Sequence, residues 1–158
     1  MSRRRKALHR SILPDPRFKS VLVTELVGVV LKQGKKTIAE QIVYTALDLL
    51  DKKVEGKETP LEKFEICLEN IKPRVEVKSR RVGGANYQVP IDVAPERQVA
   101  LAIRWITTYS QAKKGKPMMI ALATELLDAF DNTGSSVKKK DDTHKSSGGN
   151  KAFAHYRW

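Results

Sequence analysis

The sequence has very few of the residues from which disulfide-linked, metal-dependent and catalytic proteins build their sites. Cys67 is the only cysteine, which excludes an internal disulfide and a zinc site made of several cysteines. The three histidines, His9, His144 and His155, lie outside any HExxH pattern, and no GxSxG motif is present. We therefore expect no metal, no cofactor and no small-molecule substrate, and we predict a binding protein and not an enzyme.

Long apolar runs are missing as well. No stretch approaches the roughly 20 apolar residues that a membrane-spanning helix requires, so we predict no membrane partner. The N-terminus lacks the apolar segment of a secretory signal, and its short arginine-rich run leads directly into Pro14 and Pro16. We interpret it as a basic arm and not as a transit peptide.

Acidic residues are scarce too: 18 Asp and Glu stand against 30 Lys and Arg, which gives a formal net charge of +12. The excess cations are concentrated near the two ends, in one glycine-containing stretch and in one loop, whereas the apolar periodic segments are neutral or acidic. This segregation predicts a polyanionic partner. The predicted organisation is a basic tail at 1–19, a helical domain at 20–134 with a β-hairpin arm at 74–93, and a basic, aromatic segment at 135–158.

The arm is predicted from the stretch RVEVKSRRVGGANYQVPIDV at 74–93, in which apolar and polar residues alternate on both sides of two glycines. A two-residue turn on the glycines would put the two apolar sets on opposite faces. We prefer a three-residue loop, 83–85, which pairs Val77 with Ile91 and Val75 with Val93 on one face. The tip is then cationic and carries Lys78, Arg80, Arg81, Gly83, Gly84, Asn86 and Tyr87.

Elsewhere the apolar spacing is helical, which makes the fold class mainly α. We expect helices over about 20–31, 35–51, 60–72, 95–110 and 118–131. The third has a capping box, because Thr59 precedes Pro60 and Glu62. The apolar stripes, which include Val29, Ile38 and Met119, are predicted to face the core. Trp105 is interpreted as a packing residue and not as a platform for base stacking.

The last segment is less regular. Ser135 and Ser136 could cap a polar helix that carries Lys138, Lys139 and Lys140, but the run SSGG at 146–149 is expected to break it. The terminal run KAFAHYRW alternates aromatic and cationic residues. These side chains could stack on nucleotides, dock on a neighbouring protein, or fold back on the chain itself.

The candidate nucleic-acid contacts are mostly lysines and arginines in the charged segments. Gly34 and the two lysines after it begin a helix, where backbone N–H groups offer a seat for phosphate. The candidates in the tail and in the first loop are Arg3, Arg4, Arg5, Lys6, Arg10, Lys35 and Lys36. Those farther along the chain are Lys78, Arg80, Arg81, Arg97, Arg104, Lys113, Lys114, Lys116, Lys138, Lys139, Lys140, His155, Tyr156, Arg157 and Trp158.

Six stretches together resemble one known family over essentially the full length. They are SRRR at the start, QGKK at 33–36, RVEVKSRRVGGANYQVP at 74–90, ALAIRW at 100–105, VKKKDDTH at 137–144 and the closing KAFAHYRW. The family that they resemble is ribosomal small-subunit protein seven, in its bacterial or organellar form.

The resemblance implies a six-helix α fold with a protruding hairpin, located in the ribosome of the bacterial cytoplasm or of an organelle. It implies binding to the 3′ major domain of small-subunit ribosomal RNA, where family members nucleate assembly of the head. The hairpin would lie near the exit-site transfer RNA and the messenger RNA exit path, and small-subunit proteins nine and eleven would be neighbours. The motifs carry RNA contact over to Arg3, Arg4, Arg5, Lys35, Lys36, Lys78, Arg80 and Arg81.

One stretch departs from the family pattern. At 146–149 the family has a helix-favouring run resembling Met-Ala-Glu-Ala, and the serines and glycines here cost about 2–3 kcal/mol of helix propensity. The leading alternative function is a DNA-bending architectural protein with a basic β-arm. Such proteins insert an apolar wedge from the arm tip, whereas this tip is Gly-Gly-Ala. A nucleic-acid-modifying enzyme is a second alternative that no motif supports.

Overall fold

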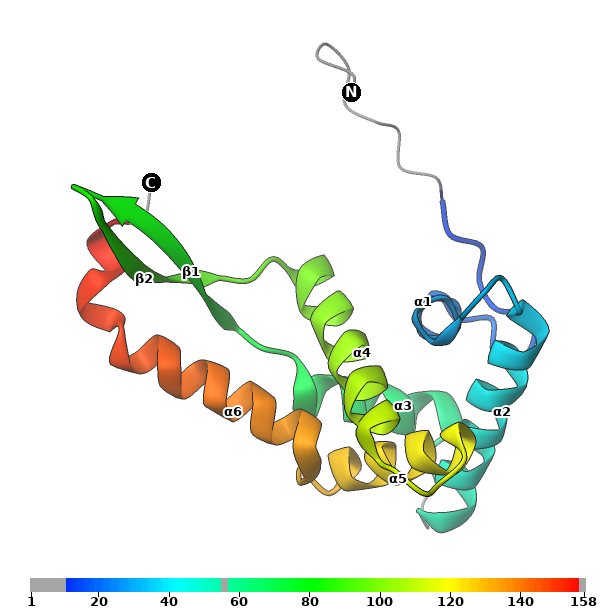
Figure 1. Ribbon diagram of the computed structural model, residues 1–158. Helices are drawn as coiled ribbons and strands as arrows, with labels where there is room; N and C mark the ends of the chain where they lie inside the picture. Colours follow the sequence, from blue (N-terminus) through cyan, green and yellow to red (C-terminus); the bar gives the residue numbers. More distant parts are fainter. Residues whose placement is uncertain (1–10, 55–56, 157–158) are drawn as a thin grey trace.

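The computed structural model describes residues 11–54 and 57–156, and it consists of a helical body from which a long arm extends (Figure 1). The body contains α1 to α5, and the arm is formed by the hairpin, α6 and a terminal 3-10 helix that lie side by side. In chain order the elements are α1 (Val21–Val30), α2 (Lys36–Lys53), α3 (Pro60–Ile71), β1 (Val75–Val82), β2 (Ala85–Asp92), α4 (Pro95–Ala112), α5 (Met118–Phe130), α6 (Gly134–Gly149) and η1 (Lys151–Tyr156). The six helices and the two-stranded antiparallel hairpin confirm the predicted fold class.

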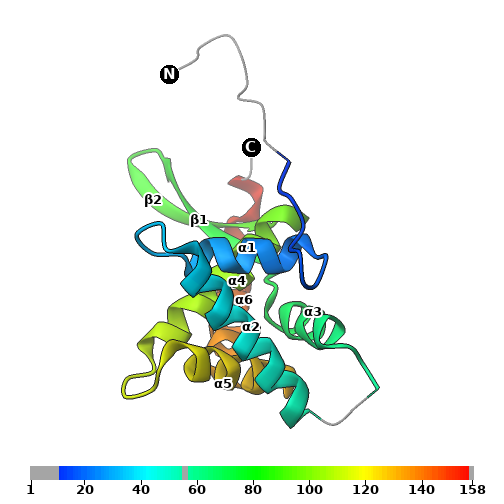
Figure 2. The same ribbon diagram turned by 90° about the vertical axis from the view of Figure 1, so that its right-hand side faces the viewer.

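The core of the body is organised around α5, which packs against α2, α3 and α4 (Figure 2). Leu122 and Leu126 of α5 are fully buried, and Cys67 of α3 packs with them. Burial raises the pKa of the Cys67 thiol to about 12, which fits the prediction of a small apolar core residue. Trp105 is half-buried against the same core, as expected for a packing residue.

Three residues that were predicted to face the core are exposed instead. Val29 is 43%, Ile38 53% and Met119 37% exposed. Ala39, next to Ile38, and Ala121, two positions after Met119, are buried instead. Further apolar residues flank each predicted apolar stripe in the sequence. Periodicity alone therefore does not determine which face of these helices is buried. Among the described residues, no helix is both long enough and apolar enough to cross a membrane.

Polar side chains close both the start of α3 and the end of α2. Thr59 and Glu62 form the predicted capping box: the Glu62 N–H donates to Thr59 Oγ1 at 3.3 Å and the Thr59 N–H donates to Glu62 Oε2 at 2.6 Å. The buried ammonium of Lys63 closes the preceding helix, because it donates to the Val54 carbonyl at 2.9 Å and pairs with Asp51 at 2.7 Å. A cation at the carboxyl end of α2 also opposes the negative end of the helix dipole.

The hairpin register differs from the prediction. The turn has two residues, Gly83 and Gly84, and β1 and β2 pair so that Val77 lies opposite Pro90 and not Ile91. Both glycines have positive φ angles, 57° and 90°, which a primed two-residue turn requires. Such a turn matches the twist of the strands, and this preference outweighed the grouping of apolar residues on one face. The apolar residues are therefore divided between both faces, and Val89 is fully buried.

The prediction that the SSGG run breaks the last helix was wrong, because α6 continues through these four residues to Gly149. Ser147, in the middle of the run, is only 5% exposed, and α6 packs against β1 along the arm. Tertiary packing therefore offsets the poor intrinsic propensity. The predicted caps were also misplaced: the N-cap is Thr133, and Ser136 lies inside the first turn.

Candidate nucleic-acid interface

The tip of the arm presents its cations on two faces. Side chains of directly paired residues share a face, so Arg80 lies with Tyr87 and Arg81 lies with Asn86. The three-residue loop preferred from the sequence would instead have paired Arg81 with Tyr87, and the observed register reverses that assignment. Arg81 is exposed and Arg80 is half-buried. The two arginines can therefore contact different phosphates.

The C-terminal segment braces the arm from one side. In η1, the ring of Phe153 packs on Tyr87 with ring centroids 5.3 Å apart. Of the three possibilities left open for this segment, the structure shows that it folds back on the chain. The predicted contact His155 is exposed, and its Nδ1 lies 2.9 Å from the Ala152 carbonyl. The 3-10 helix η1 and α6 pack along the hairpin, and together they form one projection (Figure 1).

The base of the arm is fastened to the body by an ion pair. Arg97 at the start of α4 makes a two-pronged contact with Glu76 of β1, with Nε–Oε1 at 3.0 Å and Nη2–Oε2 at 2.9 Å. The hydrogen bonds from Arg97 hold the pKa of the Glu76 carboxyl below its usual range. Lys78 lies 3.4 Å from the same carboxylate. Arg97 therefore links the hairpin to α4, whereas Arg104, two turns farther along α4, is exposed and forms no ion pair with a residue that the structure describes.

Two lysine-containing loops that are far apart in the sequence come together on the body. The α1–α2 loop supplies Lys35 and the α4–α5 loop supplies Lys113 and Lys116, and these side chains line one pocket of about 540 Å³. Lys32 lines the pocket too. It was not among the predicted contacts, because nothing in its local sequence distinguishes it from an ordinary surface lysine. Lys36 stands outside this pocket, 3.5 Å from Glu40, and Lys114 is exposed.

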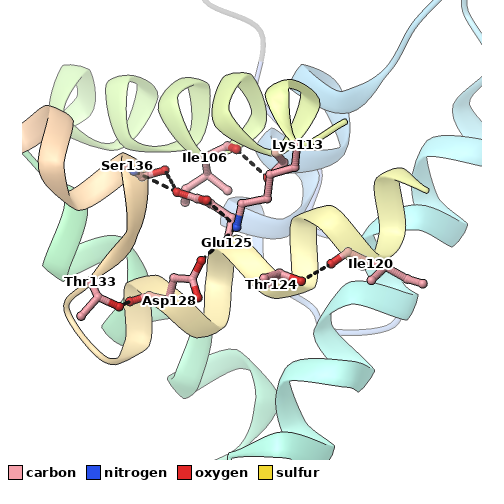
Figure 3. Close-up of polar contacts among 9 residues, drawn as sticks. Ile106, Lys113, Ile120, Thr124, Glu125, Asp128, Thr133 and Ser136 are labelled. Carbon is pink, nitrogen blue, oxygen red and sulfur yellow. Dashed lines mark hydrogen bonds and ion pairs between the residues drawn. The ribbon is translucent and has the colours of Figure 1, made fainter. Parts of the chain in front are cut away.

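Lys113 differs from its neighbours because its charge is already paired inside the protein. Its ammonium lies 2.8 Å from Glu125 Oε2 and 2.9 Å from Asp128 Oδ2 (Figure 3). Burial lowers the pKa of Lys113, but the hydrogen bonds to the two carboxylates outweigh it, so the pKa is raised above its usual value. We interpret Lys113 as the residue that fixes the α4–α5 loop.

The carboxylate of Glu125 serves a second element, since it caps α6 from a neighbouring helix. Its Oε1 accepts hydrogen bonds from the Ser136 N–H at 2.9 Å and from Ser136 Oγ at 2.6 Å (Figure 3). Glu125 is only 1% exposed. Burial raises the pKa of this carboxyl, but the hydrogen bonds from Lys113 and Ser136 prevail and hold it below its usual range. Glu125 was not among the predicted functional residues, although an acidic residue in the mostly apolar sequence of α5 was the available signal.

The remaining predicted contacts divide into three groups. Lys138 and Lys139 are exposed on α6, whereas Lys140 donates to the Asn70 carbonyl at 2.7 Å and ties α6 to α3. The backbone of Tyr156 belongs to η1. The predicted contacts that lie outside the described residues are Arg3, Arg4, Arg5, Lys6, Arg10, Arg157 and Trp158.

The arrangement as a whole defines a class of protein. A helical body carries a braced cationic arm, and exposed lysines gather on two adjoining loops. Within the part of the chain that the structure describes, no cluster of three or more His, Cys, Asp or Glu side chains could hold a metal ion. These features are typical of proteins that bind a nucleic acid through its phosphates.

Comparison with known proteins gives the particular family. The family model described as ribosomal protein S7p/S5e matches residues 2–151. The small ribosomal subunit protein uS7 of Desulfatibacillum aliphaticivorans is 52% identical over 158 residues, which cover 100% of both chains. The proteins of the same name from Mycoplasma genitalium and Thermotoga maritima are 49% and 53% identical over 156 residues, which cover 99% of each chain.

The chain belongs to the ribosomal protein S7p/S5e family. This confirms the resemblance noted from the sequence motifs. It is accordingly a component of the small ribosomal subunit, a ribonucleoprotein particle of the translation machinery. As such a component it is associated with ribosomal RNA. The family is one of structural ribosomal proteins and not of enzymes, and membership favours this role over DNA bending.

Proposed function

We propose that the chain binds a folded junction in the 3′ major domain of small-subunit ribosomal RNA and nucleates assembly of the head of the subunit. In the assembled particle the arm lies near the exit-site transfer RNA and the path by which messenger RNA leaves. Small-subunit proteins nine and eleven are its protein neighbours. The bacterial origin of the relatives named above supports a place in the ribosomes of a bacterial cytoplasm.

The observation that carries this proposal is the placement of exposed cations. Arg81 at the arm tip, Lys35 and Lys116 on the two loops, and Arg104 on α4 are all exposed, and none of them forms an ion pair with a residue that the structure describes. Unpaired surface cations are available to neutralise phosphates and release the counterions condensed on RNA. Arg97 and Lys113, in contrast, pair with carboxylates of other elements and hold those elements together.

Recognition is expected to depend mainly on the shape of the RNA. The deep, narrow major groove of A-form RNA is closed to side chains, so a protein that binds a junction reads its backbone and its irregular parts. The braced hairpin suits this task, because η1 and the ion pair between Arg97 and Glu76 fix its direction before RNA arrives. A preorganised arm loses less conformational entropy on binding than a free one.

Replacement of both tip arginines tests the proposal. We expect Arg80→Gln/Arg81→Gln to weaken binding to a transcript of the junction and to reduce the slope of log K against log salt by about 1.5, because each lost phosphate contact removes about 0.7–0.9. The melting temperature should stay close to that of the unmodified chain, since both side chains lie outside the core.

The control is Lys52→Gln/Lys53→Gln, which removes the same charge from the exposed last turn of α2. It should leave the slope within the error of the unmodified chain. Equal losses from the two double variants would show that net charge alone governs binding. A melting temperature as low as that of a core deletion would contradict the placement of the arm.

A further inference from the structure

The pocket between the two lysine loops is lined in part by apolar side chains, which phosphate binding alone does not require. Ile38 of α2 and Met118 at the start of α5 line it, together with Lys32, Lys35 and Lys116. Ile38 is 53% exposed, so it is one of the most exposed large apolar side chains in the described part of the chain. A volume of about 540 Å³ is in the range of small-molecule sites.

The charges around this pocket have one sign. Its lining contains four lysines and no aspartate or glutamate. Lys113 is held by Glu125 and Asp128, but Lys32, Lys35 and Lys116 are exposed and make no ion pair with any residue in 11–54 or 57–156. An occupant must therefore offer an anion to the exposed lysines and an apolar surface to Ile38 and Met118.

We propose that this pocket binds a single unstacked nucleotide of the bound RNA. The base lies against Ile38 and Met118, and the phosphates lie among Lys32, Lys35 and Lys116. The inference rests on the proposed RNA binding and assigns one site within it. A nucleotide has both of the required parts, a flat apolar face and an adjoining phosphate. Gln111, which is exposed in the lining, offers an amide donor and acceptor to the edge of the base.

The nucleotide in this pocket must be unstacked. Bases inside a duplex are covered above and below by their neighbours, so only a loop, bulge or end can present a free face. Both lysine loops contain tight turns, since Gln33, Gly34 and Gly115 all have positive φ angles, of 55°, 73° and 77°. Lys32, Lys35 and Lys116 flank these turn residues and line the pocket.

Binding of two matched oligomers to the full chain tests the proposal. The probes are single-stranded hexauridylate and a hexamer with the same phosphates but no bases, and the observed signals are the methyl resonances of Ile38 and Met118. We expect hexauridylate to shift both methyl signals and to bind at least about fivefold more tightly than the abasic hexamer, because a base in the pocket would bury apolar surface against Ile38 and Met118. Equal affinity, or shifts confined to lysine signals, would overturn the proposal.

Two isoleucine variants complete the test. Ile38→Ala should lower the affinity for hexauridylate about threefold to tenfold by removing apolar contact area, and should leave the affinity for the abasic hexamer unchanged. The matched control is Ile66→Ala, at a 36% exposed position of α3 that does not line the pocket. Similar losses from both variants would overturn the assignment.

An acidic peptide with an apolar side chain is the competing occupant. A glutamate-rich peptide that ends in leucine should not displace hexauridylate, and displacement at equal concentration would overturn the proposal.

Failure of the nucleotide site is distinguishable from failure of the proposed function. If the chain still binds the RNA junction tightly while the base has no effect, only the nucleotide site is wrong.

Discussion

Glu125 offers the sharpest test of how the arm is attached to the body, because one buried carboxylate fixes both the α4–α5 loop and the first turn of α6. The substitution Glu125→Gln keeps the size of the side chain and an oxygen that can accept from Ser136, but it removes the charge. Any loss of stability therefore reports the charge and not a cavity.

The magnitude follows from the contacts of this carboxylate. Two hydrogen bonds from Ser136 would change from charge-assisted to neutral, at about 1 kcal/mol each. The ion pair with Lys113 would be lost as well, but the Lys113 side chain is 23% exposed and keeps Asp128, so this loss is discounted to about 1 kcal/mol. The expected destabilisation is about 3 kcal/mol, which lowers the melting temperature of a chain of this size by about 6–12 °C.

Thermal and urea denaturation at pH 7, followed by circular dichroism, measure the effect. The control is Glu65→Gln, an exposed glutamate of α3, which should change stability by less than about 0.5 kcal/mol. Because the folded pKa of Glu125 is lowered, its contribution is present above the usual carboxyl pKa and is lost as the pH falls through the folded value. The difference between Glu125→Gln and the unmodified chain should therefore narrow below about pH 4. A variant as stable as the control at pH 7 would refute the role of Glu125.

Two further perturbations concern the arm. Gly83→Ala or Gly84→Ala should destabilise the hairpin by about 1 kcal/mol, as seen in faster amide exchange, because both positions have positive φ. In contrast, Gly28→Ala inside α1, which also meets no atom within 4 Å, should raise the melting temperature. The Arg74 N–H donates to His144 Nε2 at 3.0 Å, and burial lowers the pKa of that ring. Because protonation removes this acceptor, the protection factor of the Arg74 amide (its intrinsic exchange rate divided by its observed rate) should fall as the pH drops through the lowered pKa of His144. A protection factor that stays constant at pH values below the usual imidazole range would contradict this.

The features predicted correctly from the sequence are those that local chemistry determines. The capping box at Thr59 and Glu62 and the existence of the glycine-tipped hairpin depend on residues a few positions apart. Local signals of this kind act before any tertiary contact forms, so they can be recognised without the fold.

The features that were missed depend on contacts between distant segments. The cap of α6 comes from Glu125, 11 residues before Ser136, and the SSGG run remains helical because Ser147 is buried along the arm. The register of the hairpin was misjudged because the backbone preference of a two-glycine turn was given less weight than side-chain grouping. Charge distribution and motif resemblance together predicted the candidate contacts, but only the structure separates cations such as Lys113, which hold the fold together, from those left exposed.

The proposed function requires the exposed cations of the arm and the loops, together with the lysines and arginines of the chain ends, to act as phosphate contacts. Salt dependence of binding measures this most directly. With a transcript of the ribosomal RNA junction and the full chain, about eight engaged phosphates predict that log K falls against log salt with a slope of about −6 to −7. A slope of about −2 or shallower would contradict the account, since it would mean that most of these lysines and arginines remain in solvent when the RNA is bound.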